Sequence, residues 1–203
     1  ERLLSDVRAS PGVVSAALSA SEPMTTSMGW SMRVQRGGRG AVELVNSWVA
    51  SVSSDYFKTM GIPILRGTDL RLKGDGVGSL ISGGAPSAPW SVLVNETFVS
   101  RFLGDQDPIG ARVMGNGTMT FEIVGVVKDS ATIGIRERHE PVMYVANDRP
   151  TGTLVLHVRA AVPPAGLIKT VEDVVQRVAS DVPIFDVRTI EQQIDRLIGR
   201  ERT

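Results

Sequence analysis

The sequence predicts an α+β fold in which one lobe is inserted into another. Two stretches, residues 45–66 and 153–189, each indicate a strand, a helix and a second strand. Residues 67–150, between them, carry mostly strand patterns. Because two similar units flank a different stretch, we expect one lobe from residues 1–66 and 151–203 and an inserted mixed α/β lobe from residues 67–150.

Composition excludes several classes of function. The chain has 203 residues, 42% of them hydrophobic, and its 22 basic residues balance 22 acidic ones. A nucleic-acid partner is not expected, because binding phosphates requires a positive surface. The chain has no Cys, which rules out thiol catalysis, disulfides and Cys-based zinc sites. No run approaches the roughly 20 apolar residues that cross a bilayer.

The N-terminal part begins with a helix and continues into strands. Residues 1–10 (ERLLSDVRAS) place their apolar side chains on one helical face, and the turn Ser10-Pro11-Gly12 follows. Residues 13–19 (VVSAALS) indicate a buried strand, and residues 41–51 (AVELVNSWVAS) alternate as a strand does. This order supplies the first part of the outer lobe.

A short helix is predicted at residues 54–60 inside the stretch SSDYFKTMGIPILRG. Ser54 can cap its start, and Asp55 lies in the first turn, where the helix dipole favours a carboxylate. Gly61 can take the left-handed cap, and Pro63 prevents the helix from resuming. The element is fully specified yet carries no reactive group, so we interpret it as a structural corner.

The inserted lobe contains a second short helix and several strands. Asn95 caps this helix, Gly104 ends it, and its apolar face comprises Phe98, Val99, Phe102 and Leu103. Strands are expected on both sides of it, at residues 91–94, 111–114, 120–130 and 141–145. This combination of a short helix and several strands favours a lobe of α/β type.

The last unit is predicted to be strand, helix and strand. Residues 153–160 (TLVLHVRA) form the first strand, and residues 163–180 form a helix with Val174 at the centre of its apolar face. Residues 183–189 (PIFDVRT) indicate the second strand, parallel to the first through a right-handed crossover. Thr189 and Gln192 then form a capping box for a final helix.

The glycine-rich stretch at residues 71–91 has two readings. Its Gly74-x-Gly76-x-Gly78 pattern resembles a phosphate-binding loop, but no G-K-[ST] follows and no helix begins there. Dense Gly, Ser and Pro favour a mobile loop instead. We therefore expect neither nucleotide binding nor a cofactor.

No set of residues forms a recognised catalytic or metal-binding pattern. His157 alternates with apolar neighbours in a strand, which favours an outward or polar-edge position, and His139 lies in a charged loop. The acids near turns are Asp55, Asp105, Asp107, Asp129 and Glu140. A carboxylate pair for glycoside hydrolysis stays open from sequence alone. The sequons beginning at Asn95 and Asn116 are better explained by capping and a turn. We expect no catalytic, cofactor-binding or metal-binding residue.

Five segments, in order, resemble one known family. They are SSDYFKTMGIPILRGTDL, VLVNETFVSRFLGDQDPIGARV, FEIVGVVKDS, EPVMYV and VPIFDVRTIEQQI. Together they resemble the periplasmic core domain of MacB-type (FtsX-like) ABC transporter permeases. The resemblance covers nearly the whole chain. Residues 71–91 are longer, and residues 131–141 more charged, than is usual in that family.

The resemblance implies a location, a fold and a role. The domain would lie at the extracytoplasmic (periplasmic) face of a bacterial inner membrane, between the first and second transmembrane helices of a permease. It would have a porter-like lobe of two strand–helix–strand units and an inserted mixed lobe. It would transmit motion driven by ATP hydrolysis elsewhere, without being an enzyme. Implied partners are the rest of the permease and its ATP-binding subunit or domain, with a second permease copy or a periplasmic adaptor as further candidates.

Two alternative functions remain. The domain could capture a substrate between its lobes for export or lipoprotein release, or it could be a hydrolytic enzyme.

Both ends read as interrupted helices, so we expect a piece of a longer protein with membrane segments outside it. Helices that enter a membrane side by side would bring Leu4 and Leu197 within roughly 25 Å of each other, away from the inserted lobe.

Overall fold

The computed structural model describes residues 2–24, 28–35, 42–70, 89–115, 119–131, 139–146 and 152–201. The elements of the first part are α1 (Arg2–Arg8), β1 (Val13–Ser19), β2 (Met28–Gln35), β3 (Val42–Val52), α2 (Tyr56–Met60) and β4 (Ile64–Gly67). Those of the middle are β5 (Trp90–Asn95), α4 (Glu96–Phe98), the π-helix η2 (Val99–Leu103), β6 (Arg112–Met114), β7 (Thr120–Val127) and β8 (Val142–Ala146). The last are β9 (Val155–Ala160), the 3-10 helix η3 (Pro164–Gly166), α5 (Ile168–Val178) and α6 (Ile190–Glu201).

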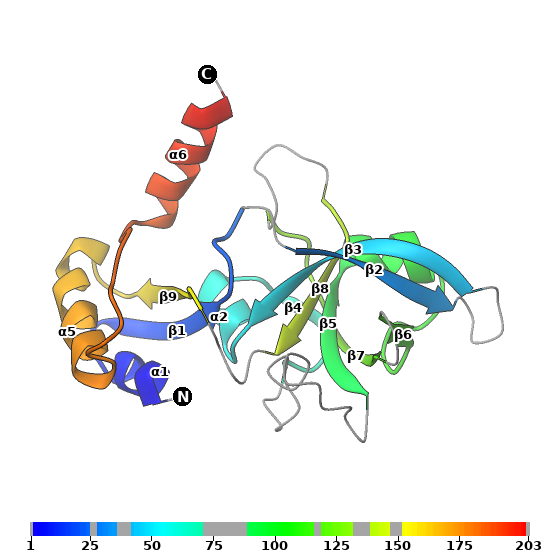
Figure 1. Cartoon of the computed structure of the whole chain (residues 1–203), viewed down its shortest axis with the longest axis horizontal. Coiled ribbons are helices and arrows are strands. Elements are labelled where there is room, and N and C mark those ends of the chain that lie inside the picture. Colours follow the sequence, from blue (N-terminus) through cyan, green and yellow to red (C-terminus); the bar gives the residue numbers. More distant parts are fainter. Residues whose placement is uncertain are drawn as a thin grey trace.

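One mixed sheet contains every described strand. Its order is β2-β6-β7-β5-β8-β3-β1-β9, β4 pairs with β7, and β2 also pairs with β3. Six strands therefore close into a ring, from which β1 and β9 extend (Figure 1). The largest apolar cluster takes alternate side chains from five of the six ring strands, including Val92, Val94, Phe121 and Ile123. Because neighbouring strands contribute the same face, this cluster fills the inside of the ring.

The extension has its own core. β1 and β9 pair antiparallel, and α1 and α5 pack together on one face of this pair. The cluster between them is centred on Leu4, Val7, Ala16 and Val174. Val174 is buried, as the helical pattern predicts. Figure 1 shows α1, α5 and α6 at one end of the long axis and β2 and β6 at the other. The separation of Leu4 from Leu197 stays a prediction.

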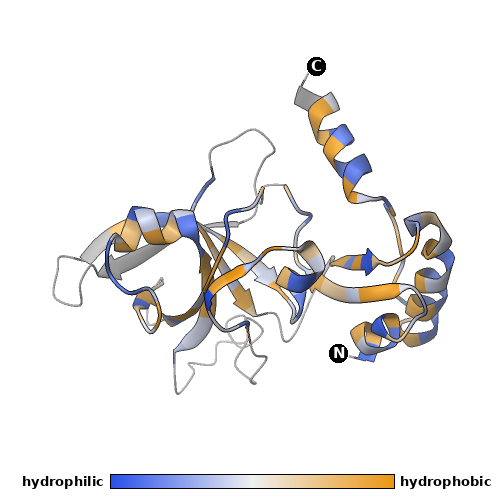
Figure 2. Ribbon diagram, turned by 180° about the vertical axis from the view of Figure 1, so that it is seen from behind, coloured by the Kyte–Doolittle hydropathy of each residue, from blue (hydrophilic) through white to orange (hydrophobic). Residues whose placement is uncertain are grey.

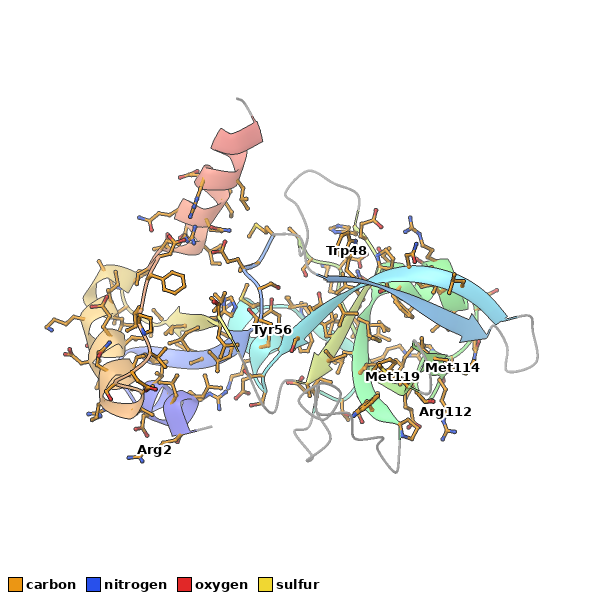
Figure 3. The ribbon with its side chains drawn as sticks, in the orientation of Figure 1. Arg2, Trp48, Tyr56, Arg112, Met114 and Met119 are labelled. Atoms are coloured by element: carbon orange, nitrogen blue, oxygen red, sulfur yellow. The ribbon has the colours of Figure 1, made fainter. Side chains whose placement is uncertain are left out.

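α2 lies at the corner between the extension and the ring. Tyr56 and Phe57 are buried, and the Phe57 ring meets the Tyr144 ring of β8 edge-on at 4.9 Å. Figure 3 shows Tyr56 midway along the molecule, between the two parts. Gly61 ends the helix with φ 72°, as predicted, and β4 then pairs with β7. The aromatic side chains thus pack against the sheet, as the interpretation of a structural corner required.

The start of α2 differs from the prediction. The residue before the helix is Asp55, not Ser54, and it has φ 61° with no side-chain cap bond. Its carboxylate instead pairs with Arg8 at 3.1 Å. The ion pair between α1 and this turn therefore replaces the local cap that the sequence suggested.

The helix ends predicted at Asn95, Gly104 and Thr189 are confirmed, whereas the helix predicted from residue 163 begins as α5 only at Ile168, after η3. Asn95 Oδ1 accepts the main-chain N–H of Phe98 at 3.0 Å, and the helical segment ends before Gly104. Before α6, the N–H of Thr189 donates to Gln192 Oε1 at 2.8 Å, and the N–H of Gln192 donates to Thr189 Oγ1 at 3.3 Å. These contacts are the two halves of the predicted capping box.

The strand predicted at residues 183–189 does not form. This segment is extended but unpaired, and β9 pairs antiparallel with β1, so no parallel crossover forms in the last unit. Within the segment Asp186 has φ 60°, a left-handed conformation that breaks a strand. Its apolar side chains are exposed, Phe185 to 67%. The predicted α+β class is nevertheless confirmed, with strands and helices in one mixed architecture.

Several predictions fall outside the described residues. They are the phosphate-loop-like glycines, residues 71–88 of the mobile loop predicted at residues 71–91, and the sequon at Asn116. The end of that loop is wrong, because Trp90 and Ser91 already belong to β5. The division into an outer lobe, residues 1–66 and 151–203, and an inserted lobe, residues 67–150, also stays a prediction. In the described sheet, strands from the two predicted lobes pair with each other. β2 and β3 come from residues 1–66; β2 pairs with β6 and β3 pairs with β8, both from residues 67–150.

Candidate functional site

A cluster of charged and polar side chains fastens α6 to the rest of the molecule. We call it the α6 anchor: Glu22, Asp186, Arg188, Gln193 and Arg196. Glu22 follows β1, Asp186 and Arg188 belong to the connector between α5 and α6, and the other two lie on α6. The anchor therefore ties a helix at one end of the chain to the end of a strand near the other.

Arg188 is the centre of the anchor. Its Nη2 donates to Glu22 Oε1 at 2.9 Å and also contacts Asp186 Oδ2. From α6, Gln193 Nε2 donates to Glu22 Oε2 at 3.3 Å, and Arg196 Nη1 donates to Asp186 Oδ2 at 3.1 Å. The Arg188 side chain is only 15% exposed, so its contacts are screened less than surface ion pairs.

The anchor is imperfect. Arg188 Nη1 and Gln193 Oε1 are buried and meet no hydrogen-bond partner within the described residues. A buried donor or acceptor without a partner costs about 1–3 kcal/mol. Asp186 is also held in a left-handed conformation. The observed position of α6 is thus stabilised by ion pairs that offset these costs.

Sequence reasoning missed the anchor. Glu22 and Arg188 are 166 residues apart, and neither belongs to a recognisable motif. The one local signal was the capping box, which placed the start of α6 correctly but not its partner. Charged residues in connectors are usually solvated, so the pairing could be found only from the fold.

A second cluster joins the extension to α2. Ser19 Oγ donates to the main-chain carbonyl of Ser21 at 2.6 Å and contacts His157 Nε2 at 2.7 Å. Since the Ser19 hydroxyl proton is already used, His157 Nε2–H is the donor in the second contact. The His157 ring meets the Tyr56 ring edge-on, with centroids 5.5 Å apart.

His157 is buried, which corrects the predicted outward or polar-edge position. Leu156 and Val158 face the cluster between α1 and α5, so His157 points to the opposite face of β9. That face is covered by α2 rather than water, which the alternation alone could not show. Burial lowers the pKa of His157 to about 4. Burial, and then the neighbouring Tyr144, raise the pKa of Tyr56 above its ordinary value.

The Ser19–His157 contact is not arranged for hydrolysis. A nucleophilic serine must give its proton to the histidine, whereas Ser19 gives it to a carbonyl. Ser19 is 3% exposed, which leaves no approach for a substrate. Within the described part of the chain no carboxylate contacts His157 to orient it. The cluster is therefore a structural junction.

Three of the acidic residues near turns, Asp107, Asp129 and Glu140, have structural partners. Asp107 accepts from Arg66 and from the N–H of Ile109, both at 3.0 Å. Asp129 accepts the hydroxyl of Thr97 at 2.8 Å and its N–H at 3.1 Å. Glu140 pairs with Arg101 at 3.1 Å. Asp105 and His139 are exposed. These contacts fix turns and helix starts, as turn chemistry predicts.

One carboxyl group stands apart from these structural acids. Burial, with a smaller effect of Asp55, raises the pKa of Asp69, while a hydrogen bond from the N–H of Leu70 opposes that rise. Asp55 itself is paired with Arg8 at 3.1 Å. The ion pair leaves Asp55 with a structural role.

No metal or membrane feature is found in the ranges that the structure describes. No three His, Asp or Glu side chains there are grouped so that they could hold a metal ion. No helix there is long and apolar enough to cross a bilayer. An open hollow of about 550 Å³ lies between α1 and α5, where Asp6, Asp173 and Arg177 are among its lining residues. All its lining residues belong to the extension.

Comparison with known proteins gives matches in structure but not in sequence. No protein-family model matches the chain, and no curated protein matches its sequence. Among solved structures, the periplasmic region of MacB from Actinobacillus actinomycetemcomitans superposes with a TM-score of 0.59 at 16% identity. The alignment covers 95% of this chain and 81% of that one.

Two further structures agree with this match. The extracellular domain of the noncanonic ABC-type transporter YknZ from Gram-positive bacteria gives a TM-score of 0.52 at 17% identity, over 89% of this chain and 82% of that one. A domain of a putative permease protein from Porphyromonas gingivalis gives 0.50 at 14% identity, over 91% and 83%. The chain has the fold of the periplasmic domain of a MacB-type ABC permease. The resemblance inferred from its five sequence segments is thereby confirmed at the level of the fold.

Proposed function

We propose that this chain is an extracytoplasmic domain of an ABC transporter permease and that it transmits conformational change from the membrane. The observation that carries the proposal is the fold, which the chain shares over 95% of its length with the periplasmic region of MacB. Its partners would be the remainder of the permease and an ATP-binding subunit or domain. The two-lobe division at residues 66–67 and 150–151 forms part of the proposal.

The α6 anchor supports a mechanical role. Among the described residues, Gln193 of α6 donates to Glu22, and Arg196 of α6 pairs with Asp186 of the connector. Both views in Figures 1 and 2 draw α6 extending from the end that holds α1 and α5. A displacement of α6 would therefore pull on the end of β1. Through the pairing of Ser19 with Val52, it would also pull on β3.

Capture of a substrate between lobes has less support. The described hollow lies between α1 and α5, inside the extension, and charged side chains form part of its lining. A substrate cleft would instead be largely apolar, with a few convergent polar groups. Mechanical transmission is the function that the geometry supports better.

The test uses the permease reconstituted with its ATP-binding subunit in lipid vesicles. In a complex whose other cysteines have been replaced, Glu22→Cys and Arg188→Cys can be joined by a cleavable bismaleimide, since residues 1–203 contain no Cys. We expect cross-linking to reduce the ATPase rate of the complex severalfold and cleavage of the linker to restore it. The matched control joins Arg66→Cys of β4 to Asp107→Cys, an exposed pair that does not involve α6. An ATPase rate unaffected by the first linker would refute the mechanical role.

A second test concerns location. The coding sequence on either side of residues 1–203 should encode a stretch of roughly 20 apolar residues. Flanking sequence that is polar on both sides would rule out placement between two transmembrane helices.

A further inference from the structure

The extension and the ring are joined by a short crossing of strands. In the described sheet, β1 pairs with β9 along its length but with β3 at Ser19 alone, opposite Val52. Main-chain bonds flank this pair, such as the one from the N–H of Ser53 to the carbonyl of Leu18 at 2.9 Å. Figure 1 shows β1 leading away from the ring at this point, with α2 beside it. The remaining contact between the two parts is therefore the packing of α2.

On the side of the ring, α2 is held by apolar side chains. Phe57 is 1% exposed and lies in one cluster with Val127 of β7 and with Val142 and Tyr144 of β8. Burial of an aromatic side chain against other rings stabilises a contact strongly. We therefore expect α2 to stay on the ring if the extension and the ring separate.

On the side of the extension, the packing of α2 is largely polar. Ala16 of β1 faces the cluster between α1 and α5, so the neighbouring Ser15 faces the opposite way. There it lies opposite Arg159 of β9, which reaches over to the carbonyl of Thr59. Ser15 Oγ and Thr59 Oγ1 are buried and meet no hydrogen-bond partner within the described residues. Water would satisfy both hydroxyls, so this contact is the weaker of the two.

Two arginines of the extension hold it to the ends of α2. Arg8 of α1 pairs with Asp55 at 3.1 Å, and Arg159 donates to the carbonyl of Thr59 at 2.8 Å. The Arg8 and Asp55 side chains are half-buried, so water can replace their contact. Both contacts can break without disturbing the apolar core of either part.

We propose that this junction is a hinge. The extension turns about the crossing at Ser19 and Val52 and separates from α2, which stays on the ring. In the closed form the two arginines hold α2; in the open form both are released and water reaches the two unpaired hydroxyls. The α6 anchor includes Glu22, just beyond the end of β1, so a pull on α6 acts beside the hinge. Its use in transmission rests on the proposed function, but the hinge belongs to this chain, so either can fail while the other holds.

The experiment measures distances between pairs of spin labels in the chain of residues 1–203. One pair, at Lys169→Cys on α5 and Ser100→Cys on η2, spans the junction, and both positions are exposed. Arg8→Ala and Arg159→Ala together release α2, so the share of molecules at a second distance should rise about tenfold or more. Adding Ser15→Ala removes a hydroxyl that only the closed form leaves unpaired, so it should lower this share again about threefold.

A reference pair of labels, at Leu44→Cys on β3 and Ser100→Cys, does not span the junction and should keep one distance in every variant. The matched control replaces Arg66 and Arg112 with alanine. These are two exposed arginines whose described ion pairs lie outside α2 and the extension, so both distances should stay unchanged.

The proposal is overturned if the variant without Arg8 and Arg159 keeps the single distance of the parent across the junction. A parallel change in the reference distance would also overturn it, because the ring would then be unfolding. The same holds if Ser15→Ala leaves the share of the second distance unchanged, since the opening would then lie elsewhere.

Discussion

Arg159 of β9 donates from Nε to the main-chain carbonyl of Thr59 in α2, at 2.8 Å. At the other end of the helix, Arg8 donates to the carbonyl of Ser54 at 3.3 Å and pairs with Asp55. Two arginines from the extension therefore hold both ends of the helix that joins it to the ring. The corner is defined by these contacts as much as by its apolar packing.

Replacing Arg159 should loosen this corner. Arg159→Ala removes a charged donor from a partly buried carbonyl, so the free energy of unfolding should fall by about 1.5–3 kcal/mol. Arg66→Ala is the control, since its ion pair with Asp107 is exposed and should contribute less than about 1 kcal/mol. Urea unfolding of both variants measures the difference. Equal losses would show that the Arg159 contact has no special role.

Asn95 should be among the costliest polar residues to remove. It is 2% exposed; its Oδ1 accepts from the N–H of Phe98 and of Val142, and its Nδ2 donates to the carbonyl of Glu140 at 2.8 Å. Asn95→Ala leaves these main-chain groups unpaired and should cost about 2–4 kcal/mol. Ser100→Ala, at an exposed hydroxyl of the same helical segment, should cost less than about 0.5 kcal/mol. A similar loss in both variants, measured by urea unfolding, would contradict this role.

The predictable features are those whose cause is local. Asn95, Gly61 and Thr189 act on residues within a few positions of themselves, so capping rules located the ends of their helices correctly. The Glu22–Arg188 pair joins residues 166 positions apart, and no local rule contains that information.

Two errors have a common physical origin. Alternation located β9 but could not tell which face of it meets water, because α2 covers the face of His157. Likewise, residues 183–189 have strand propensity, but ion pairs from outside the segment hold Asp186 in a conformation that a strand excludes. In both cases tertiary contacts override a correct local preference.

His157 should make stability depend on pH. Burial lowers its pKa from 6.5 to about 4 in the folded protein. Above pH 6.5 the ring is neutral in both states and its effect is absent. As the pH falls below 6.5 the unfolded chain takes up a proton first, so stability is lost until the folded form also protonates near pH 4. The full loss corresponds to about 3 kcal/mol.

The measurement compares urea unfolding of the wild type and His157→Gln at pH values across this range. The glutamine keeps an N–H donor for Ser19 but does not titrate. The difference between the two proteins should therefore change by about 3 kcal/mol as the pH is lowered, while carboxyl groups common to both cancel. His139→Gln, which replaces the exposed histidine, is the matched control. A difference independent of pH would show that His157 is not desolvated.

Val174 should be essential to the core of the extension. It is 5% exposed between α1, α5 and β1, so Val174→Asp would bury an unpaired carboxylate. The expected loss is about 3 kcal/mol or more, a large part of the stability of a typical domain. Gln176→Asp, two residues along on the exposed face of α5, should change stability by less than about 0.5 kcal/mol. An unchanged melting temperature for Val174→Asp would mean that the helix face is assigned wrongly.

Gly67, the last residue of β4, should tolerate no side chain. It has φ 78°, and a Cβ at this position would lie 2.1 Å from the carbonyl oxygen of Val124 in β7. The backbone fixes the position of the Cβ, and the Val124 oxygen belongs to the main chain, so neither atom can rotate away and Gly67→Ala must separate β4 from β7. We expect a loss of more than about 3 kcal/mol, with faster amide exchange along β4. Gly110 is the matched control, because it has φ 80° but no atom within 4 Å of its Cβ position. Gly110→Ala carries only the conformational cost, about 1–2 kcal/mol. If the two variants unfold at the same urea concentration, the close approach of β4 to β7 is not present in solution.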